Sequence, residues 1–324
     1  MPGFTTHYLF GKNTKEEIDN KDILTIINKY EKSFNIGLQG PDIFFYYVPA
    51  HLDSNRNIGN VMHDTTTHEY FQNLISARNE LSSPEQQEMA DAYILGFIGH
   101  YSLDTICHPY IYHKSNYMEN KDAKLKDFGN HVSLETDIDK TMLRTYLDKK
   151  PTDFSPGETI DIGSNELKVI SNVIYQAIHK TYPDHFISAM RIRNSIRSMR
   201  IENNWMKDKS GTKKKIMRSF EQLFFKHSFL SSMVPSDTIT LYDDCCNEKH
   251  NDWYNPWDEE KIRNENFFDL VDIAAKNFLR RIGLYGDMIS AHPDAITNVK
   301  IDPSSVDALL SDLGNLSYLS GLPL

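Results

Sequence analysis

The sequence predicts an all-α fold, and three observations lead to that prediction. Apolar residues recur at three- and four-residue spacings along most of the chain, which is the period of an amphipathic helix. No stretch alternates apolar and polar residues over enough positions to indicate a sheet. The segment that begins at Ser83 also carries the N-cap, proline and glutamine pattern with which helices start, formed by Ser83, Pro84 and Gln86.

The first two predicted helices differ in how far their apolar residues extend round the axis. Residues 20–34 place apolar side chains on one face, which predicts an amphipathic helix. Residues 84–107 are apolar nearly all round, which predicts a central, buried helix. Because Pro109 disfavours helical backbone at the residue before it, we expect this helix to end near His108.

The remaining helices follow the same periodicity, and a loop without period lies at 151–164. They are expected at residues 129–147, 165–182, 184–206, 213–234, 259–284 and 303–313. Residues 207–215 are polar and basic, which indicates a solvated connection. We therefore expect a single helical domain over residues 1–324, with the metal-ligand segments in residues 1–150 and supporting helices in residues 151–324.

Composition and charge are those of an ordinary globular protein and argue against some functions. The chain is 40% hydrophobic, and its net charge of −10 repels phosphate backbones and offers no attraction to anionic lipid. We therefore expect no stable nucleic-acid binding, although a local positive patch or a bound divalent metal would reverse the field at one site. No secretory signal, transmembrane segment or disulfide framework is recognisable, which predicts a cytoplasmic protein with reduced thiols.

Imidazole and carboxylate side chains recur every fourth residue in two predicted helices. His100, Asp104 and His108 share one stripe of the buried helix, and His131 and Glu135 share a face of the next. All are nitrogen or oxygen donors, which favours zinc or a similar divalent ion in a working site over a structural clip. One such pair is common by chance, but leaving buried carboxylates without partners costs on the order of several kcal/mol. A salt-bridge network is the alternative; few lysines or arginines fall on these faces, so we adopt the metal interpretation.

Two glycines lie close to His100 in the predicted central helix. Gly96 and Gly99 each cost roughly 1 kcal/mol of helix stability relative to alanine. We expect them to allow another backbone to approach closely, which would help several ligand segments to crowd together.

The order of the donor segments resembles that of the bacterial zinc-dependent phospholipases C, a family that shares its helical fold with single-strand-specific zinc nucleases. The pattern is met in order by Asp42, His63, His100 with Asp104, His108, and His131 with Glu135. The resemblance covers roughly residues 1–135, and it implies a multi-helix fold with a metal cluster at the bottom of a cleft.

The resemblance also implies two to three zinc ions and their ligands. One ion would be held by Asp42, His63, His100 and Asp104. A second would be held by His108, His131 and Glu135. A third would be held by His7, with Asp104 as a bridge. No other cofactor is implied.

The chain departs from the family pattern at three points. The family completes the third site with its N-terminal residue, generally a Trp, whereas here removal of Met1 would expose Pro2 as the possible N-terminal ligand. The interval from Asp104 to His108 is two residues shorter than usual, which leaves His113 as a substitute. His68 likewise competes with His63, which we prefer because its order and its following acidic residue fit better.

The function that the resemblance implies is hydrolysis of phosphate esters by a phospholipase C-like phosphodiesterase. Metal-activated hydroxide would attack phosphorus in line, with Asp42 orienting the water or accepting its proton as the catalytic residue. The substrate would be a small-molecule or phospholipid phosphate ester; the oligomeric state is unknown.

Further carboxylates outside the ligand set, such as those of Asp64, Asp137 and Asp139, are expected to orient the histidine ligands. Residues 250–257 are rich in aromatic and turn residues and either cap the cleft or pack against the last helix.

Two other functions remain open. The His63-Asp64 doublet is the feature expected of an HD-type metal-dependent phosphohydrolase, but that family has no use for His131 and Glu135. A zinc-binding protein without turnover would keep the scaffold and leave no open coordination position.

Overall fold

The structure is a computed structural model, and it describes residues 3–46, 57–117, 125–224, 230–290 and 303–324. Its N-terminal part contains α1 (Phe4–Lys15), α2 (Lys21–Lys29), α3 (Glu31–Gly37), the 3-10 helix η1 (Gly40–Tyr46), α4 (Ile58–Asp64), α5 (Thr67–Asn79), α6 (Pro84–Ser115) and α7 (Leu125–Leu147). Its C-terminal part contains η3 (Pro151–Asp153), α8 (Pro156–Thr159), α9 (Ser164–Thr181), α10 (Ala189–Trp205), α11 (Thr212–Phe224), strands β1 (Trp253–Asn255) and β2 (Asp258–Arg263), α12 (Phe267–Ser290) and α13 (Pro303–Leu313). The prediction of an all-α fold is confirmed.

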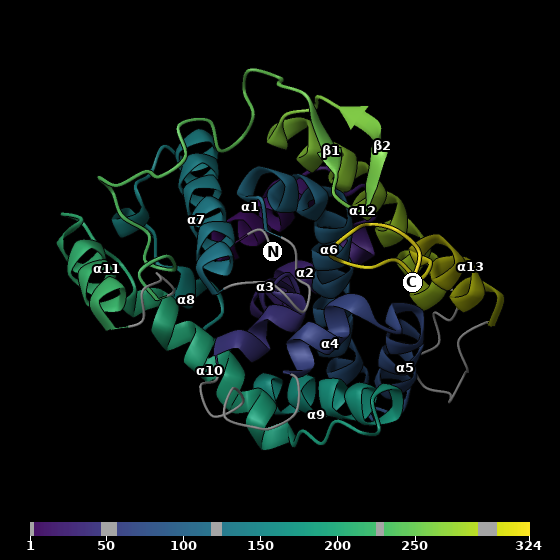
Figure 1. Cartoon of the computed structure of the whole chain (residues 1–324). Helices are drawn as coiled ribbons and strands as arrows, with labels where there is room; N and C mark the ends of the chain where they lie inside the picture. The colour runs from purple at the N-terminus through teal and green to yellow at the C-terminus, as the bar shows by residue number, and fades with distance from the viewer. Residues whose placement is uncertain (1–2, 47–56, 118–124, 225–229, 291–302) are drawn as a thin grey trace.

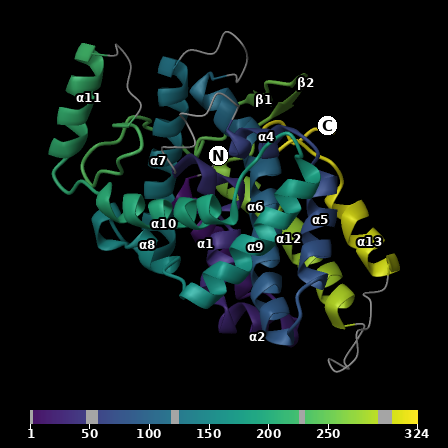
Figure 2. The same cartoon turned by 90° about the horizontal axis from the view of Figure 1, so that it is seen from below.

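Helix α6 lies at the centre of the molecule and the other helices are arranged round it (Figure 1, Figure 2). Helices α3 and α12 pack along it most closely, and α1, α5, α7 and α9 also contact it. Its side chains from Met89 to Thr105 are all buried, which is what apolar character on all sides of a helix predicts. The ligand-bearing stripe of α6 is therefore enclosed by neighbouring helices.

Helices α3 and α6 approach closely because a glycine of each faces the other. A Cβ atom on Gly96 would lie 2.0 Å from the carbonyl oxygen of Phe34, and one on Gly37 would lie 2.1 Å from that of Tyr93. The predicted role of Gly96 is confirmed. Gly99 differs, because it faces the side chains of Leu38 and Phe278 and not a backbone.

Two predicted boundaries near the N-terminal half are wrong. The helix expected at residues 20–34 is divided at Tyr30, whose φ of −121° and ψ of 45° are not helical. The division separates α2, of which only Ile23 and Ile27 are buried, from the mostly buried α3. Helix α6, in turn, does not end at His108 but continues through Pro109 to Ser115.

Helix α6 continues through Pro109 although proline removes one of its hydrogen bonds. Proline has no N–H to donate to the carbonyl of Thr105, four residues earlier. Gly321 lies against that carbonyl, since a Cβ atom at Gly321 would be 2.2 Å from the oxygen. Continuation of the helix keeps His108 on the same stripe as His100 and Asp104.

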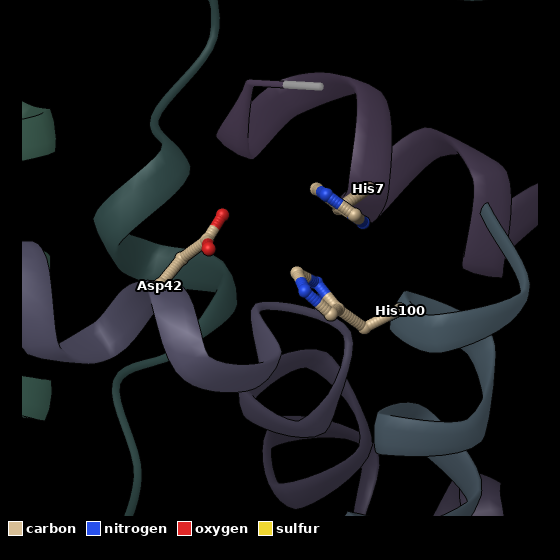
Figure 3. Close-up of side chains that lie close together, drawn as sticks. All are labelled: His7, Asp42 and His100. Carbon is tan, nitrogen blue, oxygen red and sulfur yellow. The ribbon is translucent and has the colours of Figure 1, made fainter. Parts of the chain in front are cut away.

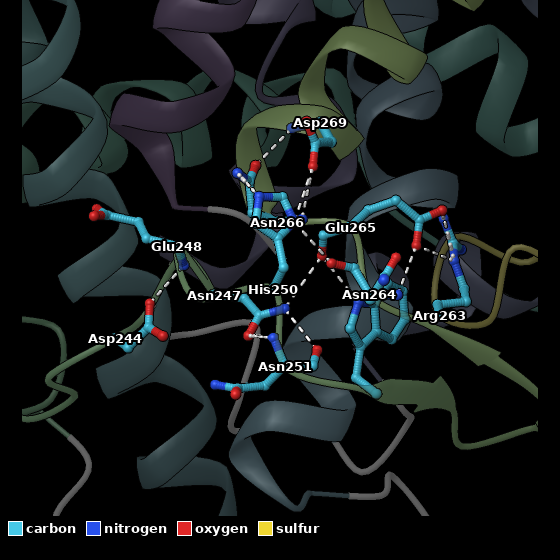
Figure 4. Close-up of polar contacts among 11 residues, drawn as sticks. Asp244, Asn247, Glu248, His250, Asn251, Arg263, Asn264, Glu265, Asn266 and Asp269 are labelled. Atoms are coloured by element: carbon cyan, nitrogen blue, oxygen red, sulfur yellow. Dashed lines mark hydrogen bonds and ion pairs between the residues drawn. The ribbon is translucent and has the colours of Figure 1, made fainter.

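A small hairpin replaces the beginning of the helix predicted at 259–284. Strands β1 and β2 pair antiparallel, and β1 packs on α6, where Trp253 contacts Tyr110. Side-chain hydrogen bonds tie the preceding loop to the start of α12: His250 contacts the carbonyl of Asn264 and the side chain of Asn266 (Figure 4). Asn266 and Asp269 then cap α12 reciprocally. Residues 250–257 thus pack against α6 and the start of α12.

The cysteines and the helices bear on two further expectations. Cys107, Cys245 and Cys246 are free and buried in the structure. Across the described ranges, none of the helices is both long and apolar enough to cross a bilayer.

The close approach of α3 and α6 gives the first prediction. Gly96→Ala should lower the free energy of unfolding by about 2–4 kcal/mol, because the new Cβ atom collides with backbone in spite of alanine's higher helix propensity. Chemical denaturation followed by circular dichroism measures the change. Gly283→Ala is the matched control: it is exposed in α12, nothing lies within 4 Å of the new Cβ atom, and we expect a gain of about 0.5–1 kcal/mol. Equal effects of both variants would contradict the steric interpretation.

Candidate metal centre

The stripe of α6 brings three of the predicted donors to one buried place. His100, Asp104 and His108 are each fully buried. The Oδ2 atom of Asp104 lies 3.0 Å from Nε2 of His100, so the spacing of four residues does place these side chains side by side. The stripe is joined by side chains from α1, η1, α4 and α7.

Asp104 divides its two oxygens between different partners. Its Oδ1 atom lies 3.2 Å from Nε2 of His7, which comes from α1. Its Oδ2 atom faces His100 and lies 3.7 Å from Nε2 of His63, which comes from α4. A carboxylate with one oxygen on each side is the arrangement needed to bridge two cations.

Asp42 approaches the same place from η1. The rings of His7 and His100 are stacked, with centroids 4.3 Å apart, and the carboxylate of Asp42 points toward the space beside them (Figure 3). One donor atom from each of these three residues lies within 4.8 Å of the others. Gly40, which begins η1 with a φ of +49°, makes room for the ring of His100, since a Cβ atom there would lie 2.3 Å from the imidazole.

A second group of donors lies at the junction of α6 and α7. His108, His131 and Glu135 place one donor atom each within 4.8 Å of the others. Nε2 of His131 lies 2.8 Å from Oε1 of Glu135, one turn further along α7. The rings of His108 and His131 have centroids 6.3 Å apart, so this group adjoins the stripe of α6. The structure therefore brings all eight predicted ligands together in two adjacent groups.

Backbone carbonyls orient three of the histidines. The Nδ1 atoms of His63, His100 and His108 lie 2.6, 3.1 and 2.7 Å from the carbonyl oxygens of Gly59, Leu38 and Tyr318 respectively. Each carbonyl accepts a hydrogen bond from Nδ1–H and leaves Nε2 directed into the cluster. The prediction that carboxylates orient these rings is wrong for these three.

The carboxylates of α7 instead fix helices and loops. Asp139 accepts hydrogen bonds from the backbone N–H groups of Thr5 and Thr6, and so it anchors the first turn of α1, which carries His7. Asp137 accepts hydrogen bonds from the N–H groups of Leu241 and Tyr242. Asp139 therefore acts on the cluster through the position of a whole helix.

Burial and the shared carboxylates set the protonation states. Burial lowers the pKa of His7, and it lowers that of His108 well below the ordinary value, so both rings are neutral and able to donate a lone pair. Burial also opposes the charged form of His63, but the nearby carboxylates of Asp104 and Asp42 outweigh it and raise the pKa to about 10. For Asp104 burial is outweighed by His100, His108 and His7, which hold the pKa well below its usual range.

The donor set fits a group of divalent cations. Within the described ranges, buried atoms without a hydrogen-bond partner include both oxygens of Asp104, Nε2 of His63, Nε2 of His100 and Nε2 of His108. Such unpaired polar atoms are rare in proteins and costly, and here they converge on one place. Because imidazole and carboxylate are the ligands of catalytic zinc, zinc ions bound there would satisfy them.

Three remaining candidates have different outcomes. His68 and His113 belong to neither group of donors. His113 packs its ring against Tyr254 of β1, with centroids 4.5 Å apart, and the backbone N–H of His68 donates to Asn315. Pro2 lies outside the described residues. The structure thus favours His63 and His108 over their substitutes, while the N-terminal ligand stays a prediction.

Tyr318 is a residue of the centre that the sequence analysis missed. Its carbonyl orients His108, its N–H donates to the carbonyl of His63, and its ring lies 5.1 Å from that of His63. It lies near the C-terminus, between Gly314 and Gly321, both with positive φ. These glycines were the one available indication that the segment folds back tightly.

The choice between neighbouring histidines gives a prediction. His63→Ala and His108→Ala should each weaken zinc binding by more than the roughly 10- to 100-fold that loss of an outer partner causes. His68→Ala and His113→Ala should leave the zinc content unchanged, because neither ring is in a donor group. Elemental analysis of the purified variants measures the zinc content. Loss of zinc in His113→Ala but not in His108→Ala would show that His113, and not His108, is the ligand.

The raised pKa of His63 gives a second prediction. At pH 7.5 the metal-free protein holds a proton on His63, whose pKa is about 10, whereas His7 and His108 are neutral. Zinc binding should therefore release about one proton from this group, and apparent affinity should fall as the pH falls. Titration calorimetry in buffers of different ionisation enthalpy counts the protons. Zinc binding to the His63→Gln variant should release about one proton fewer than binding to the wild type. An unchanged number of released protons would contradict the assignment of the proton to His63.

Comparison with known proteins agrees with the donor geometry. A family model for zinc-dependent phospholipase C matches residues 6–192, which is more than half of the chain and includes all eight donors. Neither the curated proteins nor the solved structures contain a match to the chain. On the strength of the family match and the buried groups of histidine and carboxylate donors, the chain belongs to the zinc-dependent phospholipase C family.

Proposed function

We propose that the chain is a phospholipase C-like phosphodiesterase that hydrolyses phosphate esters at a cluster of two to three zinc ions. The observation that carries the proposal is the environment of Asp104, whose buried oxygens have no hydrogen-bond partner in the described ranges and lie among three imidazoles. Membership of the zinc-dependent phospholipase C family supports the same class of reaction.

The ligands divide among the ions by proximity. Asp42, His63, His100 and Asp104 would hold one zinc, and His108, His131 and Glu135 would hold another. His7, with Asp104 as a bridge, would hold the third. Three carboxylates set against two or three dications leave an excess of positive charge, which would attract an anionic ester to a protein whose net charge is −10.

Zinc held by these residues would lower the pKa of water toward neutrality and neutralise phosphoryl oxygens, which is the chemistry that in-line attack of hydroxide on phosphorus needs. Asp42 is the residue that we assign to the water. Its side chain keeps slight exposure, in contrast to the fully enclosed Asp104, and its Oδ1 atom lies 3.3 Å from Nε2 of His63. A carboxylate at this position can orient the attacking water or accept its proton.

The substrate that family membership suggests is a lipid phosphate ester. Aromatic rings surround His131: those of Tyr112 and Tyr117 have centroids 4.7 and 5.3 Å from it, and Trp257 of the hairpin turn lies 4.9 Å from Tyr112. These rings would line an approach to the second donor group, where the predicted cleft would lie. A small-molecule phosphate ester stays the other candidate, and binding of nucleic acid is not expected.

The alternative of an HD-type phosphohydrolase loses its support. That mechanism needs the His63-Asp64 doublet as paired ligands, and Asp64 belongs to neither donor group. It also gives no role to His131 and Glu135, whose donor atoms lie 2.8 Å apart beside His108. A zinc-binding protein without turnover is distinguished by activity.

The test combines metal analysis with a panel of chromogenic phosphate esters. The wild type should contain two to three zinc ions and cleave phosphodiesters. The Asp104→Asn variant should contain less zinc, and its kcat/KM should fall by at least about 10³-fold, because the substitution removes a negative charge shared within the cluster. His185→Ala is the control, and it should change neither the zinc content nor kcat/KM.

Three results would contradict the proposal in different ways. Full zinc occupancy without hydrolysis of any ester, at several pH values, would favour the protein without turnover. Manganese or iron with monoester or nucleotide activity would favour the HD-type enzyme. If the Asp104→Asn variant kept its zinc and its activity, the assignment of Asp104 as a zinc ligand would be wrong.

A further inference from the structure

Helix α11 presents its apolar side chains outward and its charged side chains inward. Ile216, Leu223 and Phe224 are 64, 75 and 62% exposed. Lys214 and Glu221, on the opposite face of the same helix, are 2 and 5% exposed. This is the reverse of the usual orientation of an amphipathic helix in a water-soluble protein, where the apolar stripe faces the core.

Hydrogen bonds to the buried charges fix this orientation. The Nζ atom of Lys214 donates to the carbonyl of Val234 at 3.0 Å. The carboxylate of Glu221 accepts from the backbone N–H groups of Leu230 and Ser231. Rotation of α11 to bury its apolar stripe would break these hydrogen bonds and leave the carbonyl of Val234 and the N–H groups of Leu230 and Ser231 without these partners.

The apolar surface continues onto the end of α10. Ile201 and Trp205 are 59 and 62% exposed, and the ammonium group of Lys213 lies 4.3 Å from the centroid of the Trp205 ring. Lys213 also donates to the carbonyl of Trp205, so α11 is tied to the end of α10. Helix α11 lies at the edge of the molecule in both views (Figure 1, Figure 2).

The charge around this surface is opposite to that of the whole chain. Residues 189–224 contain ten lysines and arginines and three acidic residues, whereas the chain has a net charge of −10. Lys209, Lys215 and Arg218 are among the exposed basic residues at or next to α11. Exposed apolar side chains and a Trp surrounded by basic residues match the composition of helices that lie in the interface of anionic bilayers. The lysines of this surface distinguish it from the core of a protein interface, which is depleted in lysine.

We propose that α11 and the end of α10 form a docking surface for anionic lipid bilayers. Ile216, Leu223, Phe224 and Trp205 enter the boundary between head groups and acyl chains, and the flanking lysines contact lipid phosphates. With thirteen residues, α11 is about 20 Å long, too short to cross the hydrocarbon core, so it lies in the plane of the membrane. The helix falls outside the residues 6–192 that match the family, and the proposal does not depend on the zinc cluster.

Co-sedimentation with vesicles of phosphatidylcholine, with and without phosphatidylserine, tests the docking surface. The wild type should bind the vesicles that contain phosphatidylserine, and binding should weaken as salt rises. The double variant Leu223→Ser, Phe224→Ser should lower the partition coefficient about tenfold or more, because two apolar side chains no longer enter the bilayer. Lys209→Gln with Lys215→Gln should weaken binding to the anionic vesicles and reduce its dependence on salt.

Ile262→Ser is the matched control, because Ile262 is 70% exposed but belongs to β2, away from this surface. It should bind vesicles like the wild type. Equal binding by the wild type and the Leu223→Ser, Phe224→Ser variant, or no binding by the wild type, would overturn the proposal. Self-association that the same variant abolishes, without vesicle binding, would show instead that this surface joins two copies of the chain.

The docking experiment fails or succeeds separately from the proposed reaction. The two double variants of this surface and the control Ile262→Ser should all keep their zinc content and their rate on a water-soluble phosphodiester, since none of the changed residues lies in a donor group. A protein that binds vesicles but hydrolyses no ester would leave the docking surface intact and remove only the proposed activity.

Discussion

The organisation of this protein depends on one buried carboxylate. Asp104 has no exposed surface, lies at the centre of the longest helix, and faces imidazoles from α1, α4 and its own helix. An isolated carboxylate in such a place would be strongly destabilising, because water is excluded and its neighbours are mostly apolar. The surrounding histidines do not solve this by themselves, since two of them are held neutral by burial. Zinc bound at this place would satisfy the carboxylate and the imidazoles together, and would tie the stability of the core to the chemistry of the site.

The packing around α6 serves the same requirement. Gly37 and Gly96 bring α3 against α6, and the carbonyl of Leu38, just after α3, then accepts the hydrogen bond from Nδ1 of His100. Asp139 fixes the first turn of α1 and thereby His7. Main-chain carbonyls suit this role because the position of a carbonyl is set by the packing of its helix and not by a rotamer. The rings are therefore oriented by the same contacts that build the core.

Much of this could be predicted from the sequence, and the exceptions have identifiable causes. The stripe of His100, Asp104 and His108 follows from helical geometry alone, as does the pair on α7. The prediction that α6 ends at His108 was wrong because the preference against helix before proline is local. Tertiary packing overrides it here, since the residues from Cys107 to Tyr112 are buried in the continuing helix. The β1–β2 hairpin was missed because three residues of β1 carry too short an alternation to detect. Tyr318 acts through main-chain atoms, which carry no side-chain pattern at all.

Helix α11 shows the limit of the same reasoning in a different way. Its periodicity predicted a helix over residues 213–234, whereas α11 ends at Phe224 and residues 230–233 form turns. The usual inference would also place Ile216 and Leu223 in the core. The structure places Lys214 and Glu221 there, because each finds backbone partners in residues 230–234 that its long side chain can reach. A pattern of apolar residues establishes that a helix has two faces, but the available hydrogen-bond partners decide which face is buried. Where charged side chains take the inner position, the apolar side is left for a partner outside the chain, and the basic residues around it specify that the partner is anionic.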